Sequence, residues 1–439
     1  MKKTFLSLLI LLVSVPVMAQ NEGAKFRKID SLMNYYYANN KFMGSVAIRE
    51  KDKVVFAKAY GFADVENQTP ATVDTKYKIG SVTKMFTATI VFQLVEEKKL
   101  TLETKLSEYF PKIKNAEKIT IGSMLNHKSG IFNFTADSTF ATYNTKLQSR
   151  KDMLDRLYSY PAAFEPGTKA EYSNSNYLLL GYIIQDITKK SYKENVMARV
   201  INKAGLKNTY YFGKINPKKK EAYSYRYKNN EWEKSEEWHE SIAGGAGALQ
   251  STASDLTKFA EALFIGKLIT PESLTEMTQI DMGFGKGVFN FPFGERKFIG
   301  HNGGIDGFSS VLAYYPKENV AFSLLLNAQN CDFNELVLGI LSSYYKLPYR
   351  FPNFKTVEVE DTVLKSYEGN YRNPKLPFTI NVKLVDGKLR IHADEQGTFY
   401  VNAISTTEFS HDASGVVMVF SPKGFTLKQN GAETFFTKE

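Results

Sequence analysis

Cysteine is nearly absent from this chain. Cys331 is the only cysteine among the 439 residues, which excludes an intramolecular disulfide. We also expect that the protein is not a lipoprotein, because no cysteine follows the segment where a lipid-carrying residue would lie. The fold must therefore depend on its core. Hydrophobic residues make up 43% of the chain, which is enough for a sizeable core.

Histidine is scarce as well, and the usual signatures of cofactor sites are missing. The five histidines show no metal-ligand spacing, so we expect no metal site. The chain has no phosphate-binding glycine loop and no metalloprotease motif, so we expect no cofactor. It also lacks the Gly-x-Ser-x-Gly elbow that carries the nucleophile of α/β-hydrolases.

No apolar run is long enough for a membrane span of roughly 18 to 20 residues. The apolar stretch Phe5 to Val13 follows Lys2 and Lys3 and precedes Val17-Met18-Ala19, which offers small cleavage positions. This pattern predicts a signal peptide over residues 1–19, with a membrane anchor as the alternative. We therefore expect export to a periplasm or to the medium, and no transmembrane segment after cleavage.

Charge of neither sign is concentrated along the chain. The formal net charge is +10, but lysines and acidic residues are interspersed, and the one basic run, Lys218 to Lys220, has the composition of a solvated loop. We expect no nucleic-acid partner. Attraction to an anionic cell-wall polymer stays open, and so does the oligomeric state.

The length of the chain predicts two domains, the first of mixed α/β type. Ser45 to Arg49 and Lys53 to Lys58 read as a hairpin, and Met85 to Leu100, without Gly or Pro, reads as a buried helix. We expect mainly helices over residues 102–160 and 174–210, central strands over Gly307 to Tyr315 and Val320 to Asn327, and a helix near Asn334 to Tyr345.

Composition changes after Pro348 and Pro352. Short alternating segments follow, such as Phe378 to Val382 and Lys388 to Ile391, joined by turns like Asp386-Gly387. A small β-barrel or sandwich fits this pattern. We predict a signal peptide over 1–19, a first domain over 20–350, a linker over 351–360 and an all-β domain over 361–439.

The candidate chemistry begins with Ser81-Val82-Thr83-Lys84. Residues three apart on a helix share a face, so the Lys84 amine can reach the Ser81 hydroxyl, and the helix N-terminus favours negative charge there. A lysine buried among apolar neighbours has a lowered pKa and can take part in proton transfer. The motif alone is weak, because Ser343 and Lys346 form a second copy.

Two further motifs follow Ser81 in order, Tyr172-Ser173-Asn174 and His301-Asn302-Gly303. With them the chain resembles the superfamily of serine β-lactamases and penicillin-binding proteins, in the class C-type branch that includes D-Ala-D-Ala carboxypeptidases, D-aminopeptidases and esterases. The flanking sequences are similar too, at Leu125 to Gly130, Phe164 to Thr168, Gly244 to Thr252 and Gly300 to Gly304.

The resemblance implies roles for single residues. Ser81 matches the nucleophile, Lys84 its proton partner, and Tyr172 the phenol that activates the serine or protonates the leaving group. Asn174 matches the side chain that holds a substrate amide. His301 and Gly303 match the third motif of the substrate site, and the N–H groups of Ser81 and Gly304 would form the oxyanion hole.

The resemblance also implies a fold and an activity. The expected fold is an antiparallel sheet flanked by helices, an all-helical subdomain carrying Tyr172, and a C-terminal β-barrel. His301 stands where β-lactamases have a lysine, so a fixed cation for a substrate carboxylate is lost. We therefore expect an exported serine hydrolase that forms an acyl-enzyme on Ser81 and acts on small or peptide substrates with D-residues, cell-wall-derived ones among the candidates. An esterase, a weak β-lactamase and a non-turnover penicillin-binding or sensor protein remain alternatives.

Overall fold

The computed structural model describes residues 16–228, 231–354, 356–393, 397–411, 415–429 and 432–439. Two compact units form, Met33–Cys331 and Asp332–Glu439, the latter together with the N-terminal residues up to Leu32. The predicted signal peptide lies, up to residue 15, outside the described residues, and the predicted domain boundaries stay predictions. Among the described helices, none is both long and apolar enough to cross a membrane.

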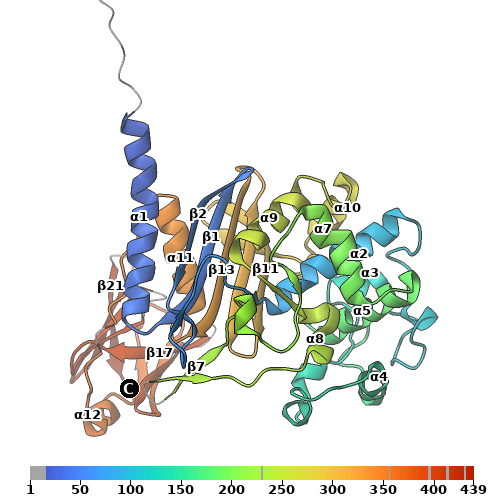
Figure 1. Ribbon diagram of the computed structural model, residues 1–439. Coiled ribbons are helices and arrows are strands. Elements are labelled where there is room, and N and C mark those ends of the chain that lie inside the picture. The colour runs from blue at the N-terminus through green and yellow to red at the C-terminus, as the bar shows by residue number, and fades with distance from the viewer. Residues whose placement is uncertain (1–15, 229–230, 355, 394–396, 412–414, 430–431) are drawn as a thin grey trace, which may run out of the picture. The chain divides into compact units, whose positions relative to one another are not determined.

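The first unit contains an eight-stranded sheet with the main order β10-β11-β12-β13-β1-β2 (Figure 1). Along this path neighbouring strands are antiparallel, and β7 joins β13 in parallel. The predicted hairpin and both predicted central strands are confirmed. The strands are β1 (Phe42–Glu50), β2 (Lys53–Tyr60), β7 (Tyr225–Lys228), β8 (Glu231–Lys234), β10 (Phe289–Phe293), β11 (Arg296–Ile305), β12 (Phe308–Tyr315) and β13 (Val320–Gln329).

Helix α9 (Ala253–Phe264) covers one face of this sheet (Figure 1). Its N-terminus is capped by the Thr252 side chain, and its apolar face is buried. Phe264 stacks on Tyr314 of β12 with ring centroids 4.6 Å apart, and Arg49 of β1 lies 3.3 Å from Glu261. These contacts hold α9 against the sheet. The helical part of the unit packs against α9 in turn.

The helical part is centred on α2 (Thr83–Glu96), whose residues are buried as far as Leu94. Phe86 of α2 stacks on Phe259 of α9 at 3.7 Å. The other helices are α3 (Ile121–Leu125), α4 (Arg150–Ser159), α5 (Asn174–Thr188), α6 (Tyr192–Val196), α7 (Asn202–Ala204), α8 (Glu240–Gly247) and α10 (Pro271–Thr278). Two small sheets complete the unit, β3 (Phe62–Asp64) with β4 (Thr69–Pro70), and β5 (Tyr77–Lys78), β9 (Leu249–Ser251) and β6 (Tyr210–Tyr211) in the order β5-β9-β6.

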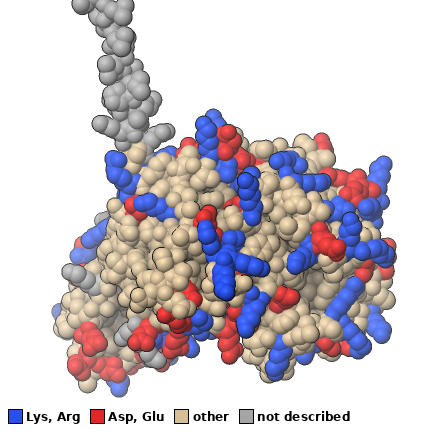
Figure 2. All heavy atoms as spheres, in the orientation of Figure 1, with Lys and Arg blue, Asp and Glu red and all other residues tan. Residues whose placement is uncertain are grey.

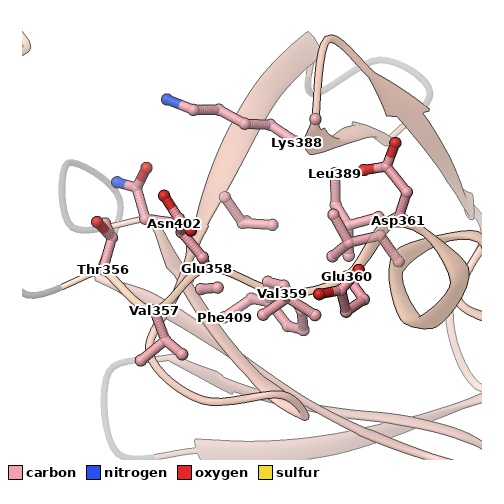
Figure 3. A pocket seen from close by; sticks show the side chains of 14 residues that line it. Thr356, Val357, Glu358, Val359, Glu360, Asp361, Lys388, Leu389, Asn402 and Phe409 are labelled. Carbon is pink, nitrogen blue, oxygen red and sulfur yellow. The ribbon is translucent and has the colours of Figure 1, made fainter. Parts of the chain in front are cut away.

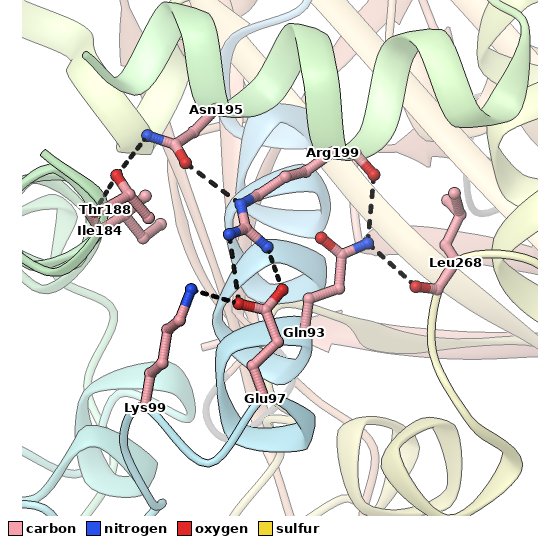
Figure 4. A network of polar contacts seen from close by, with 8 residues as sticks. All are labelled: Gln93, Glu97, Lys99, Ile184, Thr188, Asn195, Arg199 and Leu268. Carbon is pink, nitrogen blue, oxygen red and sulfur yellow. Dashed lines mark hydrogen bonds and ion pairs between the residues drawn. The ribbon is translucent and has the colours of Figure 1, made fainter. Parts of the chain in front are cut away.

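A polar network holds the C-terminal end of α2 (Figure 4). Arg199, in a π-helical turn over Met197–Ile201, donates to Glu97 at 2.6 Å. The Gln93 amide donates to the carbonyl oxygens of Arg199 at 3.1 Å and Leu268 at 2.9 Å. The helix that begins beside Ser81 is thus anchored at its far end as well.

Two predicted helical segments differ from the structure. The predicted helix to Leu100 ends at Glu96, because Lys98 adopts the left-handed conformation with φ 57° and turns the chain. Residues 102–160, predicted to be mainly helical, contain only α3 and α4 as α-helices, both at most ten residues long. The rest forms turns and short 3-10 segments, since Pro111 and Gly130 interrupt the chain.

The second unit contains a closed eight-stranded β-barrel, which confirms the predicted C-terminal β-domain. Tyr371 of the first strand pairs with Lys438 of the last, and the Asp386-Gly387 turn joins two strands through left-handed residues. The strands are β14 (Gly369–Arg372), β15 (Thr379–Val385), β16 (Lys388–Ala393), β17 (Gly397–Ala403), β18 (Glu408–His411), β19 (Val416–Ser421), β20 (Gly424–Gln429) and β21 (Ala432–Lys438). Helices α11 (Phe333–Tyr344) and α12 (Asp361–Ser366) belong to the same unit.

A cavity of about 550 Å³ lies in this second unit (Figure 3). Apolar residues such as Leu389 and Phe409 line it together with Glu358 and Glu360 from the segment before α12. The Lys388 side chain extends away from the other labelled residues. On the face shown in Figure 2, basic and acidic side chains are interspersed, as the sequence predicts.

Candidate active site

Ser81 lies in a 3-10 turn, Gly80–Val82, that leads from β5 into α2. The first N–H groups of a helix have no carbonyl partner within it, so they face outward at this point. Gly80 has φ 48°, and a Cβ atom on it would lie 2.8 Å from the Gly304 carbonyl oxygen. Only glycine allows this left-handed turn to pack against β11. Ser81 is therefore held between the start of α2 and the third motif.

Lys84 is fully buried beside Ser81. Its Nζ lies 2.9 Å from Ser81 Oγ, 2.8 Å from Asn174 Oδ1 and 2.7 Å from the Ala246 carbonyl oxygen. Burial disfavours the ammonium form and lowers the pKa of Lys84 well below its usual value. A neutral amine has two N–H bonds and one lone pair, and two of its three neighbours here are pure acceptors. The lone pair can thus face the Ser81 hydroxyl.

The carbonyl that orients Lys84 comes from a kink in α8. Gly244 has φ 42° and ψ −134°, outside the helical region, and the carbonyls after it turn towards α2. Gly245 accepts a hydrogen bond from Thr87 Oγ1 at 2.6 Å, and Ala246 accepts from Lys84. The Gly244-Gly245 pair was a signal in the sequence, but a main-chain acceptor could not be assigned from it.

Tyr172 and Asn174 complete the cluster around Ser81. The Tyr172 hydroxyl donates to Ser81 Oγ at 2.7 Å. Asn174, at the start of α5, donates its side-chain N–H to Thr135 Oγ1 at 3.0 Å and its main-chain N–H to Asn133 Oδ1 at 3.0 Å. These bonds leave the amide oxygen for Lys84. Burial raises the pKa of the Tyr172 phenol, which therefore keeps its proton at neutral pH.

His127 supports Tyr172 from behind. The ring centroids of the two residues lie 4.5 Å apart, and His127 Nδ1 accepts the Ser173 N–H at 3.2 Å. Burial, with a contribution from Lys84 in its protonated form, holds the pKa of His127 well below its usual range, so this ring is neutral. The sequence identified His127 only as part of a family-like segment and predicted no role for it.

The third motif lies on β11, next to Ser81. A Cβ atom on Gly303 would come within 2.3 Å of the Ile79 carbonyl oxygen and 2.9 Å of the Ser81 nitrogen, so the two main chains meet directly. Gly304 packs against Gly80 in the same way. The structure therefore brings together all seven residues that the sequence predicts for the site, Ser81, Lys84, Tyr172, Asn174, His301, Gly303 and Gly304.

His301 is neutral. Its side chain is 1% exposed, and burial, with a contribution from Lys84 in its protonated form, lowers the pKa of His301 to about 3. The sequence predicted a conditional charge at this position, and burial removes that charge over the ordinary pH range. Phe289 of β10 packs edge-on against the imidazole at 4.5 Å and also contacts Phe284 at 5.3 Å. No sequence motif marked these two aromatic residues.

A buried ion pair connects the strand before Ser81 with the turn after Gly304. Lys78 Nζ lies 2.7 Å from Asp306 Oδ2, and the two side chains are 1% and 0% exposed. Glu237 lies 3.4 Å from the same amine, and Asp306 Oδ1 accepts the Trp238 N–H at 2.8 Å. These contacts fix the two chain segments that flank Ser81.

Breaking this pair is expected to destabilise the first unit. Asp306→Ala leaves the Lys78 ammonium buried with only the more distant Glu237, and such a loss costs about 3 kcal/mol. The exposed pair Lys151–Asp155 is the matched control, and Asp155→Ala should cost less than about 1 kcal/mol. Urea unfolding followed by tryptophan fluorescence measures both, since the only two tryptophans, Trp232 and Trp238, lie in this unit. Equal costs for the two variants would contradict the role of the buried pair.

Metal-ligand clusters are not found in the part of the chain that the structure describes. The family model described as Beta-lactamase matches residues 38–337, well over half of the chain. This chain belongs to the beta-lactamase family. The predicted superfamily and the predicted serine hydrolase class are thereby confirmed.

Three known proteins are similar to this beta-lactamase-family chain. Penicillin-binding protein 4* of Bacillus subtilis (strain 168) is 25% identical over 93% of this chain and 98% of that protein. The teichoic acid D-alanine hydrolase of Staphylococcus aureus (strain NCTC 8325 / PS 47) is 27% identical over 70% of this chain and 75% of that protein. The crystal structure of D-amino acid amidase from Ochrobactrum anthropi SV3, complexed with L-phenylalanine amide, has a TM-score of 0.66 at 26% identity and covers 73% of this chain and 99% of that chain.

Proposed function

We propose that this protein hydrolyses amide or peptide bonds next to D-residues through an acyl-enzyme on Ser81. One observation carries the proposal. Ser81 Oγ lies between Lys84 Nζ at 2.9 Å and the Tyr172 hydroxyl at 2.7 Å. Lys84 is suited to accept the Ser81 proton, and Tyr172 is suited to donate a proton to the leaving group. This polar cluster is buried next to the outward-facing N–H groups of a helix start, where negative charge is favoured.

In the first step the Ser81 oxygen attacks the substrate carbonyl, and its proton passes to the neutral amine of Lys84. The carbonyl oxygen becomes negatively charged, and the N–H groups of Ser81 and Gly304 are the proposed donors for it. The close packing of Gly80 on Gly304 supports this pairing, because it brings the main chains around Ser81 and Gly304 into contact.

In the second step the leaving nitrogen needs a proton. The Tyr172 phenol donates it as the carbon–nitrogen bond breaks, and the proton held by Lys84 replaces it. The raised pKa of Tyr172 supports this role over that of a base, because the phenol is protonated at neutral pH. Water then attacks the acyl-enzyme with the same groups acting in reverse, which releases the acid and restores Ser81. Asn174, fixed by Thr135 and Asn133, is the proposed donor to a substrate carbonyl beside the scissile bond.

The substrate class rests on the relatives and on His301. Two of them bear names of enzymes that act on D-amino acid amides and on the D-alanine of teichoic acid. A neutral His301 offers no charge for the carboxylate of a β-lactam or a free peptide terminus. Export belongs to the same proposal, and the predicted signal peptide supports it.

Turnover of a substrate panel tests the proposed specificity. D-Phenylalanine amide, its L-enantiomer, p-nitrophenyl acetate and nitrocefin are compared with the protein after removal of residues 1–19. We expect kcat/KM for the D-amide to exceed that for the L-amide at least about tenfold, the discrimination that one displaced binding contact gives. Nitrocefin should be the poorest substrate. Hydrolysis of nitrocefin alone, or equal rates for the two enantiomers, would overturn the assignment.

A further inference from the structure

The His301 imidazole has its two nitrogens in different states. Nδ1 bonds the Asn302 carbonyl oxygen, which is an acceptor, so Nδ1 carries the proton. In a neutral imidazole the other nitrogen, Nε2, then presents a lone pair and can only accept a hydrogen bond. The third motif of this chain therefore offers an acceptor at a position where a lysine would offer donors.

This acceptor has no partner. Nε2 is buried and is without a hydrogen bond among the described residues. Buried polar atoms of native proteins are nearly always satisfied, and one that is not needs an explanation such as a catalytic role or a bound group. An unpaired acceptor in the cluster around Ser81 is placed to take its missing donor from a substrate.

The surroundings of His301 define which donor fits. Its titratable neighbours are Lys84, Tyr172 and His127, and none of them carries an anionic group at neutral pH. Phe289 of β10, which is partly exposed, packs edge-on against the imidazole. These surroundings hold no anion and suit an uncharged group with an N–H bond. A carboxylate has only acceptor atoms and would meet the lone pair of Nε2.

We propose that His301 determines specificity by accepting, at Nε2, a hydrogen bond from the N–H of an amide leaving group after the Phe289 ring turns aside. The inference rests on the proposed function, since it assigns the leaving group of the same reaction. It predicts that amides are favoured over esters with the same acyl group, beyond their difference in intrinsic reactivity. It also predicts that a leaving group with a carboxylate is disfavoured.

A pair of substrates isolates this hydrogen bond. D-Phenylalanine amide and D-phenylalanine methyl ester share the acyl group, but only the amide has an N–H on its leaving group. The deciding quantity is the ratio of kcat/KM for the amide to kcat/KM for the ester. This ratio does not change when a variant lowers both rates by the same factor. His301→Leu should lower this ratio about five- to tenfold, the factor of one hydrogen bond. His301→Lys should lower it as well, and should raise the relative rate of D-phenylalanyl-D-alanine, whose carboxylate meets the new ammonium.

His127→Leu is the matched control, because it removes a second buried neutral imidazole next to Tyr172. It should lower both rates by the same factor. A similar change of the ratio in His127→Leu and His301→Leu would overturn the proposal, and so would an unchanged ratio in His301→Leu.

A spectroscopic measurement serves where a variant does not fold. In Ser81→Ala with 15N-labelled histidine, the His301 Nε2 resonance should have the shift of an unprotonated nitrogen. It should move on addition of D-phenylalanine amide and stay in place with the methyl ester. A resonance that responds to neither overturns the inference. Failure of the proposed function is distinct, because it shows as absent turnover of both substrates by the unmodified protein.

Discussion

Replacing Ser81 by alanine is expected to abolish covalent labelling by a fluorophosphonate and to lower kcat by about 10⁶-fold, as loss of the nucleophile does in serine hydrolases. The labelling is measured by mass spectrometry on the intact protein, and the turnover with D-phenylalanine amide. Circular dichroism should be unchanged, because Lys84 and Tyr172 keep their other contacts in the cluster. The residual rate reports what the oxyanion donors and substrate binding contribute without a covalent step.

Ser343→Ala is the control for this prediction. Ser343 begins the second Ser-x-x-Lys copy, but α11 ends at Tyr344 and Lys346 has a left-handed φ of 56°. The two side chains therefore do not share a helical face, and the variant should be labelled like the unmodified protein. Persistent labelling of Ser81→Ala, with loss of labelling in Ser343→Ala, would refute the assignment of the nucleophile.

Replacing Lys84 by alanine is expected to lower the acylation rate about 10²- to 10⁴-fold, the range for loss of a general base. KM should change far less, because Lys84 acts on the proton of Ser81 and not on the substrate. Single-turnover kinetics separate acylation from binding. Lys151→Ala, at an exposed lysine, is the control and should leave the rate unchanged. A loss confined to KM would contradict the role of Lys84 in proton transfer.

The same assignment fixes the direction of the pH dependence. The amine of Lys84 accepts a proton only when neutral, and its pKa is lowered, so activity should be present above this lowered pKa and fall as pH drops through it. His301 adds no limb between pH 5 and 8, since its pKa is about 3. In Lys84→Ala the acid limb that belongs to Lys84 should disappear.

Much of this site can be predicted from the sequence, because the motifs encode main-chain geometry as well as chemistry. Gly303 and Gly304 mark where two backbones touch, and the spacing of Ser81 and Lys84 follows from a helical turn. The hairpin, the central strands and the barrel follow from alternation of apolar residues, which responds directly to burial on one or two faces.

The remaining features depend on contacts between distant segments. The Ala246 carbonyl orients Lys84 only because α8 kinks at Gly244, and a kink does not appear in a residue pattern. Phe289 of β10 meets His301 of β11 across two neighbouring strands. The pKa of His301 depends on how completely its surroundings exclude water, which the unperturbed value of histidine cannot indicate.

The anchoring of α2 at both ends has a mechanical consequence. The helix begins beside Ser81 and ends in the network of Gln93, Glu97 and Arg199, so it is held at both ends. It can neither shift along its axis nor rotate without breaking the contacts at one end. The spacing between Ser81 and its neighbours is therefore tied to the integrity of a region some four helical turns away, and substitutions there would act on catalysis without touching any substrate.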